Sequence, residues 1–138
     1  MKDFQGKVAV ITGAGRGIGR GIALHCAAEG MQIADRWYTG PLIVSASQLL
    51  TDWETREIGD LGEQQLEPVF GLEPEVVLVG TGPKQVFPPP ELLMCFYRRN
   101  IGVEFMNTRA ACRTFNVLVS DQRNVVAALL PPGPGPTD

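Results

Sequence analysis

The chain has 138 residues, enough to bury the core of one domain but not of two. Its hydrophobic share of 44% and its charged share of 20% are ordinary for a globular protein. A net charge of −3 argues against nucleic-acid binding, because phosphate recognition usually shows as a basic excess. Apolar runs of a few residues predict no membrane span, and no apolar signal core precedes Gly13. We therefore expect a cytoplasmic protein.

Metal and thiol chemistry have little support in the sequence. The three cysteines, Cys26, Cys95 and Cys112, are an odd number and have no CxxC spacing, which argues against a disulfide framework or a zinc site. His25 is the only histidine and lies in an expected helix, where a place on the helix surface is favoured over catalysis. We expect reduced thiols and no bound metal.

In the first half of the chain, the sequence pattern predicts short strands, one helix and a second, weaker helix. Lys7 to Thr12 is a β-branched apolar run, and a glycine cluster and a helical pattern follow it as far as Gly30. Met31 to Ala34 and Pro41 to Ser45 predict two strands that pair as a hairpin. Leu61 to Phe70 carries a weak helix pattern.

The second half alternates strands with helices. The expected strands are Glu75 to Val79, Gly102 to Met106 and Asn124 to Leu130, and the helices are Glu91 to Arg99 and a segment that begins at Asn107 or Thr108. This order predicts an α/β fold: a single compact layered domain with a mostly parallel, Rossmann-like core and an N-terminal hairpin.

Apolar spacing predicts which sides of the two helices are buried. The first helix would bury Leu92, Leu93, Phe96 and Tyr97, and the second would bury Ala111, Phe115, Leu118 and Val119. Arg98 and Arg99 suit the C-terminus of the first helix, where cations complement the helix dipole.

The opening of the chain resembles the short-chain dehydrogenases. Thr12 to Gly19 fits the TGxxxGxG pattern of that family, in which glycines let the backbone approach a pyrophosphate at a helix N-terminus. An acid about twenty residues later can bind a ribose hydroxyl. The resemblance implies NAD or NADP binding through Gly13, Gly17, Gly19 and Asp35.

The catalytic part of the dehydrogenase pattern is absent. The family's Tyr-x-x-x-Lys motif would need a lysine four residues after a tyrosine, but Leu42 follows Tyr38 at that spacing and Ile101 follows Tyr97. A complete dinucleotide domain also needs two βαβαβ halves. A dinucleotide-binding fragment or an NAD(P)-dependent oxidoreductase is therefore the alternative interpretation.

A second resemblance covers residues 31–132. Three ordered segments are similar to domain-of-unknown-function family 498, which includes proteins like mitochondrial complex I assembly factor 3. They are Tyr38 to Val44 followed by Trp53, then Val77 to Gly82, and finally Gly102 to Glu104 followed by Thr108 to Leu118, Arg123 and Val126 to Pro131. The resemblance implies a Rossmann-like layered α/β fold and no established enzymatic activity.

The two resemblances divide the chain into three parts. Residues 1–30 are a dehydrogenase-like opening, added as an appendage or a fusion; residues 31–132 are the assembly-factor-like domain; and residues 133–138 are a flexible tail. The expected function is protein interaction or complex assembly without catalysis or a cofactor. The partner is an unknown protein, and a homo-oligomer is compatible with the sequence.

Two groups of residues are candidates for contacting a ligand or a partner. Gly80, Thr81 and Gly82 follow the clearest strand, where backbone N–H groups could meet an anion, or where the turn simply needs glycine. Thr108, Arg109, Arg113 and Asn116 begin the next helix, as a polar anchoring surface or as an N-cap with a solvated basic face. Parallel strands would bring both groups to one edge of the sheet. An exposed aromatic patch of Trp37, Tyr38 and Trp53 is a further alternative to core packing.

Overall fold

Two apolar segments of the sequence form the centre of the structure. The computed structural model describes residues 2–3, 10–12, 31–33, 36–55 and 57–132. In it, strand β7 (Val76–Gly80) and strand β9 (Val125–Leu129) lie side by side, and almost all of their residues are buried. Strands that are covered on both faces need continuous apolar runs, which these segments supply.

The remaining elements surround these two strands. The other strands are β1 (Lys2–Asp3), β2 (Val10–Thr12), β3 (Met31–Ile33), β4 (Arg36–Tyr38), β5 (Leu42–Ser45), β6 (Gln48–Leu50) and β8 (Gly102–Met106). The helices are the 3₁₀ turn η1 (Ile58–Asp60), α2 (Glu67–Phe70), α3 (Pro90–Tyr97) and α4 (Thr108–Ser120).

The described residues form one large mixed sheet. Its six strands have the order β1-β6-β5-β9-β7-β8. The pairs of β7 with β8 and with β9 are parallel, as the sequence predicts for the segment from Glu75 onward. The pairs on the other side, which join β9, β5, β6 and β1, are antiparallel. The α/β fold and its parallel centre are confirmed, but the sheet as a whole is not mostly parallel.

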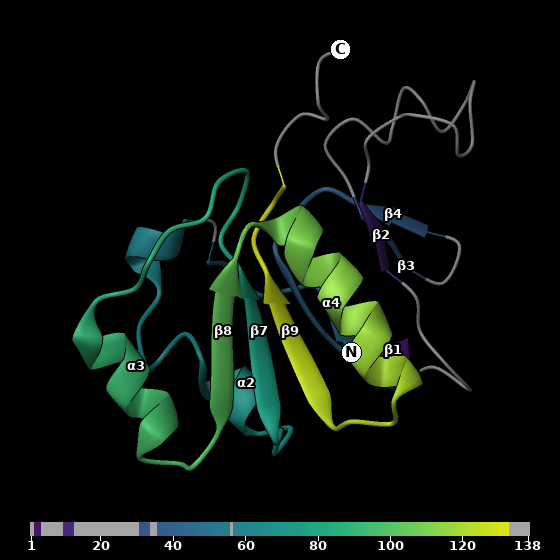
Figure 1. Ribbon diagram of the computed structural model, residues 1–138. Coiled ribbons are helices and arrows are strands. Elements are labelled where there is room, and N and C mark those ends of the chain that lie inside the picture. The colour runs from purple at the N-terminus through teal and green to yellow at the C-terminus, as the bar shows by residue number, and fades with distance from the viewer. Residues whose placement is uncertain (1, 4–9, 13–30, 34–35, 56, 133–138) are drawn as a thin grey trace.

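Helices cover both faces of this sheet (Figure 1). Strand β8 lies on one side of β7 and β9 lies on the other, so the two crossover connections run in opposite directions. Because such connections are right-handed, α3 and α4 pack on opposite faces. The carboxyl ends of β7, β8 and β9 therefore meet at a point where the chain reverses direction across the sheet, the usual place for a site in α/β folds.

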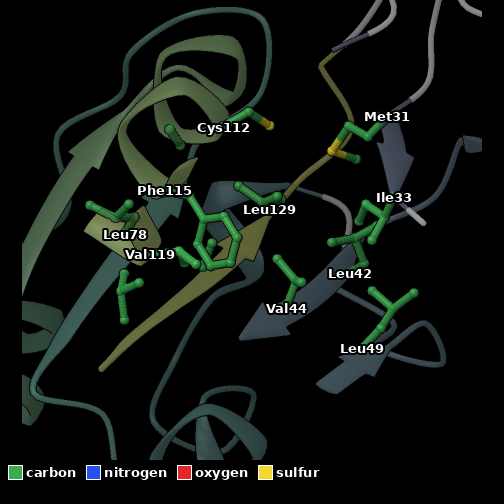
Figure 2. Close-up of a cluster of buried hydrophobic side chains, with 13 residues drawn as sticks. Met31, Ile33, Leu42, Val44, Leu49, Leu78, Cys112, Phe115, Val119 and Leu129 are labelled. Atoms are coloured by element: carbon green, nitrogen blue, oxygen red, sulfur yellow. The ribbon is translucent and has the colours of Figure 1, made fainter. Parts of the chain in front are cut away.

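One side of α4 packs on the sheet as predicted. Phe115 is fully buried among side chains of β5, β7 and β9, and Figure 2 shows it between Leu78, Leu129 and Val44. Ala111 and Val119 lie in the same cluster, and Leu118 packs at its margin. Truncation of a buried phenylalanine costs about 3–5 kcal/mol, so this contact is a main attachment of the helix.

The predicted hairpin between 31–34 and 41–45 is wrong. Strand β3 pairs with β2 and β4 in a small antiparallel sheet, whereas β5 pairs with β6 and β9. Only two residues separate Ile33 from Arg36, a spacing that suits a tight hairpin. Met31 and Ile33 are buried in the cluster under α4. The small sheet thus extends the core on the α4 face.

Several predictions fall wholly or partly outside the described residues. Of the Lys7 to Thr12 strand, the described part is β2. The dehydrogenase-like residues Gly13, Gly17, Gly19 and Asp35, the helix with His25 and Cys26, and the tail 133–138 lie outside them. The weak pattern over 61–70 forms only the short helix α2 at its end.

Candidate functional site

The carboxyl ends of the parallel strands bring the two predicted candidate groups together. The backbone N–H of Gly82 donates to the Thr108 Oγ1 at 2.9 Å, and the N–H of Thr108 donates to the Gly82 carbonyl at 2.9 Å. The Thr108 hydroxyl also donates to the Leu130 carbonyl at 2.7 Å. One fully buried threonine therefore joins the ends of β7 and β9 to the start of α4. We call this region the carboxyl edge.

The structure requires glycine at two positions of the carboxyl edge. A Cβ on Gly80 would lie 2.9 Å from the Thr108 Oγ1 and 3.0 Å from the Thr108 Cα, which is too close for any side chain. Gly82 has a φ of +107°, a conformation that other residues rarely adopt. The turn therefore requires glycine at these two positions for reasons of space and backbone conformation.

Thr81 also uses its polar groups within the chain. Its N–H donates to the Met106 carbonyl at 2.8 Å, and its hydroxyl donates to the Lys84 carbonyl at 2.6 Å. The same hydroxyl oxygen accepts from the Val86 N–H at 3.2 Å. These bonds fix the first turn of the loop that leads from β7 to α3.

The start of α4 combines an N-cap with a basic surface. The Asn107 side chain accepts a hydrogen bond from the Ala110 N–H at 2.8 Å, as its position predicts. Arg113 is exposed, whereas Arg109 and Asn116 are half-buried and take part in interactions. Arg109 and Arg113 are four residues apart and Asn116 follows Arg113 by three, so they share one side of the helix.

Cys112 lies under this basic surface but is not an activated thiol. Burial raises the pKa of the Cys112 thiol to about 12, although the charges of Arg109 and Arg113 act in the opposite direction. The thiol is therefore protonated at neutral pH, and nucleophilic chemistry requires the thiolate.

At the opposite end of β7, the Asn124 N–H and the Arg123 side chain lower the pKa of Glu75 below its ordinary value.

The prediction of an exposed aromatic patch is wrong for Trp53, which is buried. This side chain is only 6% exposed, and its indole N–H donates to the Gln65 carbonyl at 2.8 Å. Trp37 and Tyr38 are half-buried, and Tyr38 packs against the core under α4. Among the described residues, the exposed aromatic side chains are Phe87 and Tyr97, which lie elsewhere in the chain.

Sequence reasoning missed an exposed apolar segment between β7 and β8. Within the described residues, the exposed large hydrophobic side chains are Val86, Phe87, Met94, Tyr97 and Val117, and four of these five lie in 86–97. Phe87 is 79% exposed. The prediction that Tyr97 is buried is wrong: it is 61% exposed, because α3 buries Leu92, Cys95 and Phe96 instead. The run of prolines after Phe87 was the available signal for a loop held away from the core. We call residues 86–97 the α3 flank.

A groove lies beside the α3 flank. It has a volume of about 430 Å³ and runs between α3 and residues 61–63. Leu61, Pro89, Leu92, Met94 and Cys95 provide its apolar lining, and Glu63, Glu91 and Arg98 provide its charges.

A cluster of charges closes one end of the groove. Glu63 forms ion pairs with Arg98 at 3.5 Å and with Arg99 at 2.8 Å. Arg99 also donates to the Cys95 carbonyl at 3.0 Å and stacks over the Phe70 ring at 4.1 Å. The predicted arginines at the helix end therefore bond its last turn and join it to residue 63.

The part of the chain that the structure describes offers no candidate for a metal site or for a membrane-spanning helix. No cluster there contains three or more His, Cys, Asp or Glu side chains arranged to hold a metal ion. No helix in the same residues is long and apolar enough to cross a membrane.

The sequence matches the model of a known protein family. The profile described as protein of unknown function DUF498/DUF598 matches residues 24–130, well over half of the chain. The chain belongs to this family. The second resemblance seen in the sequence is thereby confirmed, and the match begins at residue 24 rather than 31. The dehydrogenase resemblance receives no support from it.

Relatives of this DUF498 protein come from bacteria and animals. It is 36% identical over 111 residues to the mouse (Mus musculus) protein named NADH dehydrogenase (ubiquinone) 1 alpha subcomplex assembly factor 3, and the match covers 79% of this chain and 59% of the mouse protein. It is 35% identical over 95 residues to the 13 kDa major membrane protein of Francisella tularensis, with 67% of this chain and 76% of that protein covered. The chain therefore spans about three-fifths of the mouse relative.

A solved structure has the same fold. The crystal structure of a Bordetella parapertussis protein matches with a TM-score of 0.76 and 29% sequence identity. The match covers 92% of this chain and 98% of the Bordetella chain. The arrangement of helices around the mixed sheet is therefore shared across nearly the whole of both chains.

Proposed function

We propose that this protein binds another protein during the assembly of a larger complex and does not catalyse a reaction. The mouse relative is named as an assembly factor, and the match covers 79% of this chain and 59% of that protein. The observation that carries the proposal is that four exposed large apolar side chains lie within residues 86–97, the α3 flank. Apolar side chains that gather on a surface mark interaction sites more often than those that are scattered singly.

The composition of the α3 flank suits a protein partner. Phe87 and Tyr97 are large aromatic side chains that lose little conformational entropy on binding, and such residues dominate the energetics of interfaces. Pro88, Pro89 and Pro90 restrict the backbone beside Phe87, which reduces the ordering that binding requires. This preorganisation supports recognition by a fixed surface.

Polar groups at the carboxyl edge support the same interpretation. The N–H groups of Thr81 and Gly82 and the hydroxyl of Thr108 are bonded within the chain, and Cys112 is a protonated thiol. We propose that no nicotinamide cofactor is needed. Titration with NADH and NADPH, followed by fluorescence and by turnover of a panel of carbonyl substrates, tests this. Saturable binding with turnover would restore the oxidoreductase alternative.

Affinity purification from the native host tests the assembly proposal. We expect the wild-type protein and the Ser47→Ala variant to recover the same proteins, because Ser47 is an exposed residue of the turn between β5 and β6, which belongs neither to the α3 flank nor to the basic surface of α4. Phe87→Ser should reduce that recovery at least tenfold at an unchanged melting temperature. Equal recovery with Phe87→Ser would remove the α3 flank from consideration.

The basic surface of α4 is a second proposed contact region. Arg113 is exposed, so Arg113→Glu should leave the fold intact while reversing a charge next to Arg109. A smaller loss of recovery than for Phe87→Ser would assign Arg113 a supporting role. A cytoplasmic location and a homo-oligomeric state stay predictions, to be checked by cell fractionation and analytical ultracentrifugation.

A further inference from the structure

We infer that the groove between α3 and residues 61–63 binds a short apolar segment of the partner protein that carries a lysine or arginine beside its apolar residues. This inference rests on the proposed function, because it assigns a chemistry to the partner of the α3 flank. The proposed occupant is a peptide segment with apolar residues and one basic residue. The alternatives, a second copy of this chain and a neutral small molecule, are distinguished by the test.

The groove is preformed because its floor belongs to the core. Leu61, Leu92 and Cys95 line it and are only 7%, 3% and 6% exposed, so they are already held by packing. Pro89 restricts the wall at the start of α3, and Met94 projects from the middle of the helix with 46% of its surface exposed. A binding site of this kind needs little reorganisation when an apolar side chain enters.

The charges at the two ends of the groove differ. At one end Glu63 pairs with both Arg98 and Arg99, so this cluster joins the two walls and carries one net positive charge. At the other end lies Glu91, seven residues before Arg98 and therefore about 10 Å away along the helix. Among the described residues, no cation forms an ion pair with the Glu91 carboxylate. The Glu91 end of the groove thus carries a carboxylate without a cation partner among the described residues.

This distribution selects the occupant. An apolar side chain fits the floor beside Met94, and a cation that follows it meets Glu91, whereas an acidic segment would be repelled there. The charge at the rim determines specificity more than total affinity, and an exposed pair contributes roughly a fivefold preference at most. The apolar contact with Met94 supplies the larger share of binding.

Three labelled peptides of twelve residues test the inference. They share a leucine-rich core and differ at one flanking position, which is lysine, glutamine or glutamate. We expect the lysine peptide to bind the full-length protein about fivefold more tightly than the glutamate peptide in fluorescence anisotropy. The preference should reverse with Glu91→Lys. Met94→Ser should weaken all three peptides, and Val117→Ser should leave them unchanged.

Nuclear magnetic resonance and sedimentation complete the test. Chemical-shift changes should concentrate at residues 61–63 and 89–98. Equal affinity for the lysine and glutamate peptides, or shift changes confined to other residues, would overturn the inference. Concentration-dependent dimers that Met94→Ser dissociates would overturn it in favour of a second copy. If Phe87→Ser abolishes partner recovery but Glu91→Lys and Met94→Ser do not, the groove is excluded while the assembly function stands.

Discussion

The carboxyl edge and the α3 flank are opposite in how they use their polar and apolar groups. At the carboxyl edge, Gly80 to Gly82 and Thr108 look like a ligand site in the sequence, but their hydrogen bonds are made within the chain. Their partners are one another, Leu130, Met106 and Lys84. On the α3 flank, residues without any motif leave large apolar side chains in solvent. The comparison teaches that the edge is built for stability and that the flank is available for recognition. Substitutions should separate the two roles.

Among substitutions at the carboxyl edge, the largest expected effect on stability is at Thr108. Thr108→Val keeps the shape of the side chain but leaves the buried Gly82 N–H and Leu130 carbonyl without their partner, at a cost of about 2–4 kcal/mol in the free energy of unfolding. Urea denaturation measures it. Thr114→Val is the matched control, because it removes only a 3.6 Å contact to the Met106 sulfur. Equal stability of the two variants would contradict the structural role of the carboxyl edge.

Gly80→Ala should destabilise the folded protein by a little less than Thr108→Val. The added Cβ would meet the backbone of Thr108 at 3.0 Å, and a backbone contact cannot be relieved by a rotamer change. Overpacking of this kind costs about 1–3 kcal/mol in the free energy of unfolding. Gly59→Ala is a suitable control, because a Cβ there has no atom within 4 Å. A melting temperature that falls no further for Gly80→Ala than for this control would show that the edge tolerates expansion.

Loss of the N-cap of α4 should have a moderate effect. Asn107→Ala removes the acceptor for the Ala110 N–H and should cost about 1 kcal/mol in the free energy of unfolding. Ser120→Ala, at the other end of the same helix, should change it much less, because that residue is exposed and is not the N-cap. Chemical denaturation of both variants checks the difference, and a larger loss for Ser120→Ala would be inconsistent with the cap.

The smallest effect on stability should come from the α3 flank. Phe87→Ser should change the free energy of unfolding by less than about 0.5 kcal/mol, because 79% of the side chain is already in solvent. Phe105→Ser provides the contrast: this residue is 8% exposed in β8 and its loss should cost about 3 kcal/mol or more. If thermal melts show that Phe87→Ser is as damaging as Phe105→Ser, the flank has a structural role and the comparison fails.

Local patterns were enough to predict much of the second half of the chain. The runs that became β7, β8 and β9, the cap at Asn107 and the buried stripe of α4 are properties of neighbouring residues. Strand–helix alternation then limits the parallel strands to a few arrangements. The same reasoning placed Gly80 to Gly82 and Thr108 at one edge, which their mutual hydrogen bonds now show.

Structural features that depend on residues far away in the sequence were predicted less well. The spacing of Tyr97 gives it the same apolar appearance as Phe96, but whether it is buried depends on how far the core extends past the end of α3. Likewise, two strand-like segments near residue 40 do not reveal which strands they pair with, since β5 joins β9 across more than eighty residues.

From Glu75 onward the sequence by itself determined which segments are strands and helices, because periodicity, capping and glycine content act within a few residues. It did not predict the short strands β4 and β6. Only the tertiary structure decided what the apparent site residues do. The Thr108 hydroxyl is 26 residues from Gly82 and 22 from Leu130, and no local pattern indicates that these three groups satisfy one another. Exposure is decided in the same way, because Phe87 stays in solvent only where no other segment covers it.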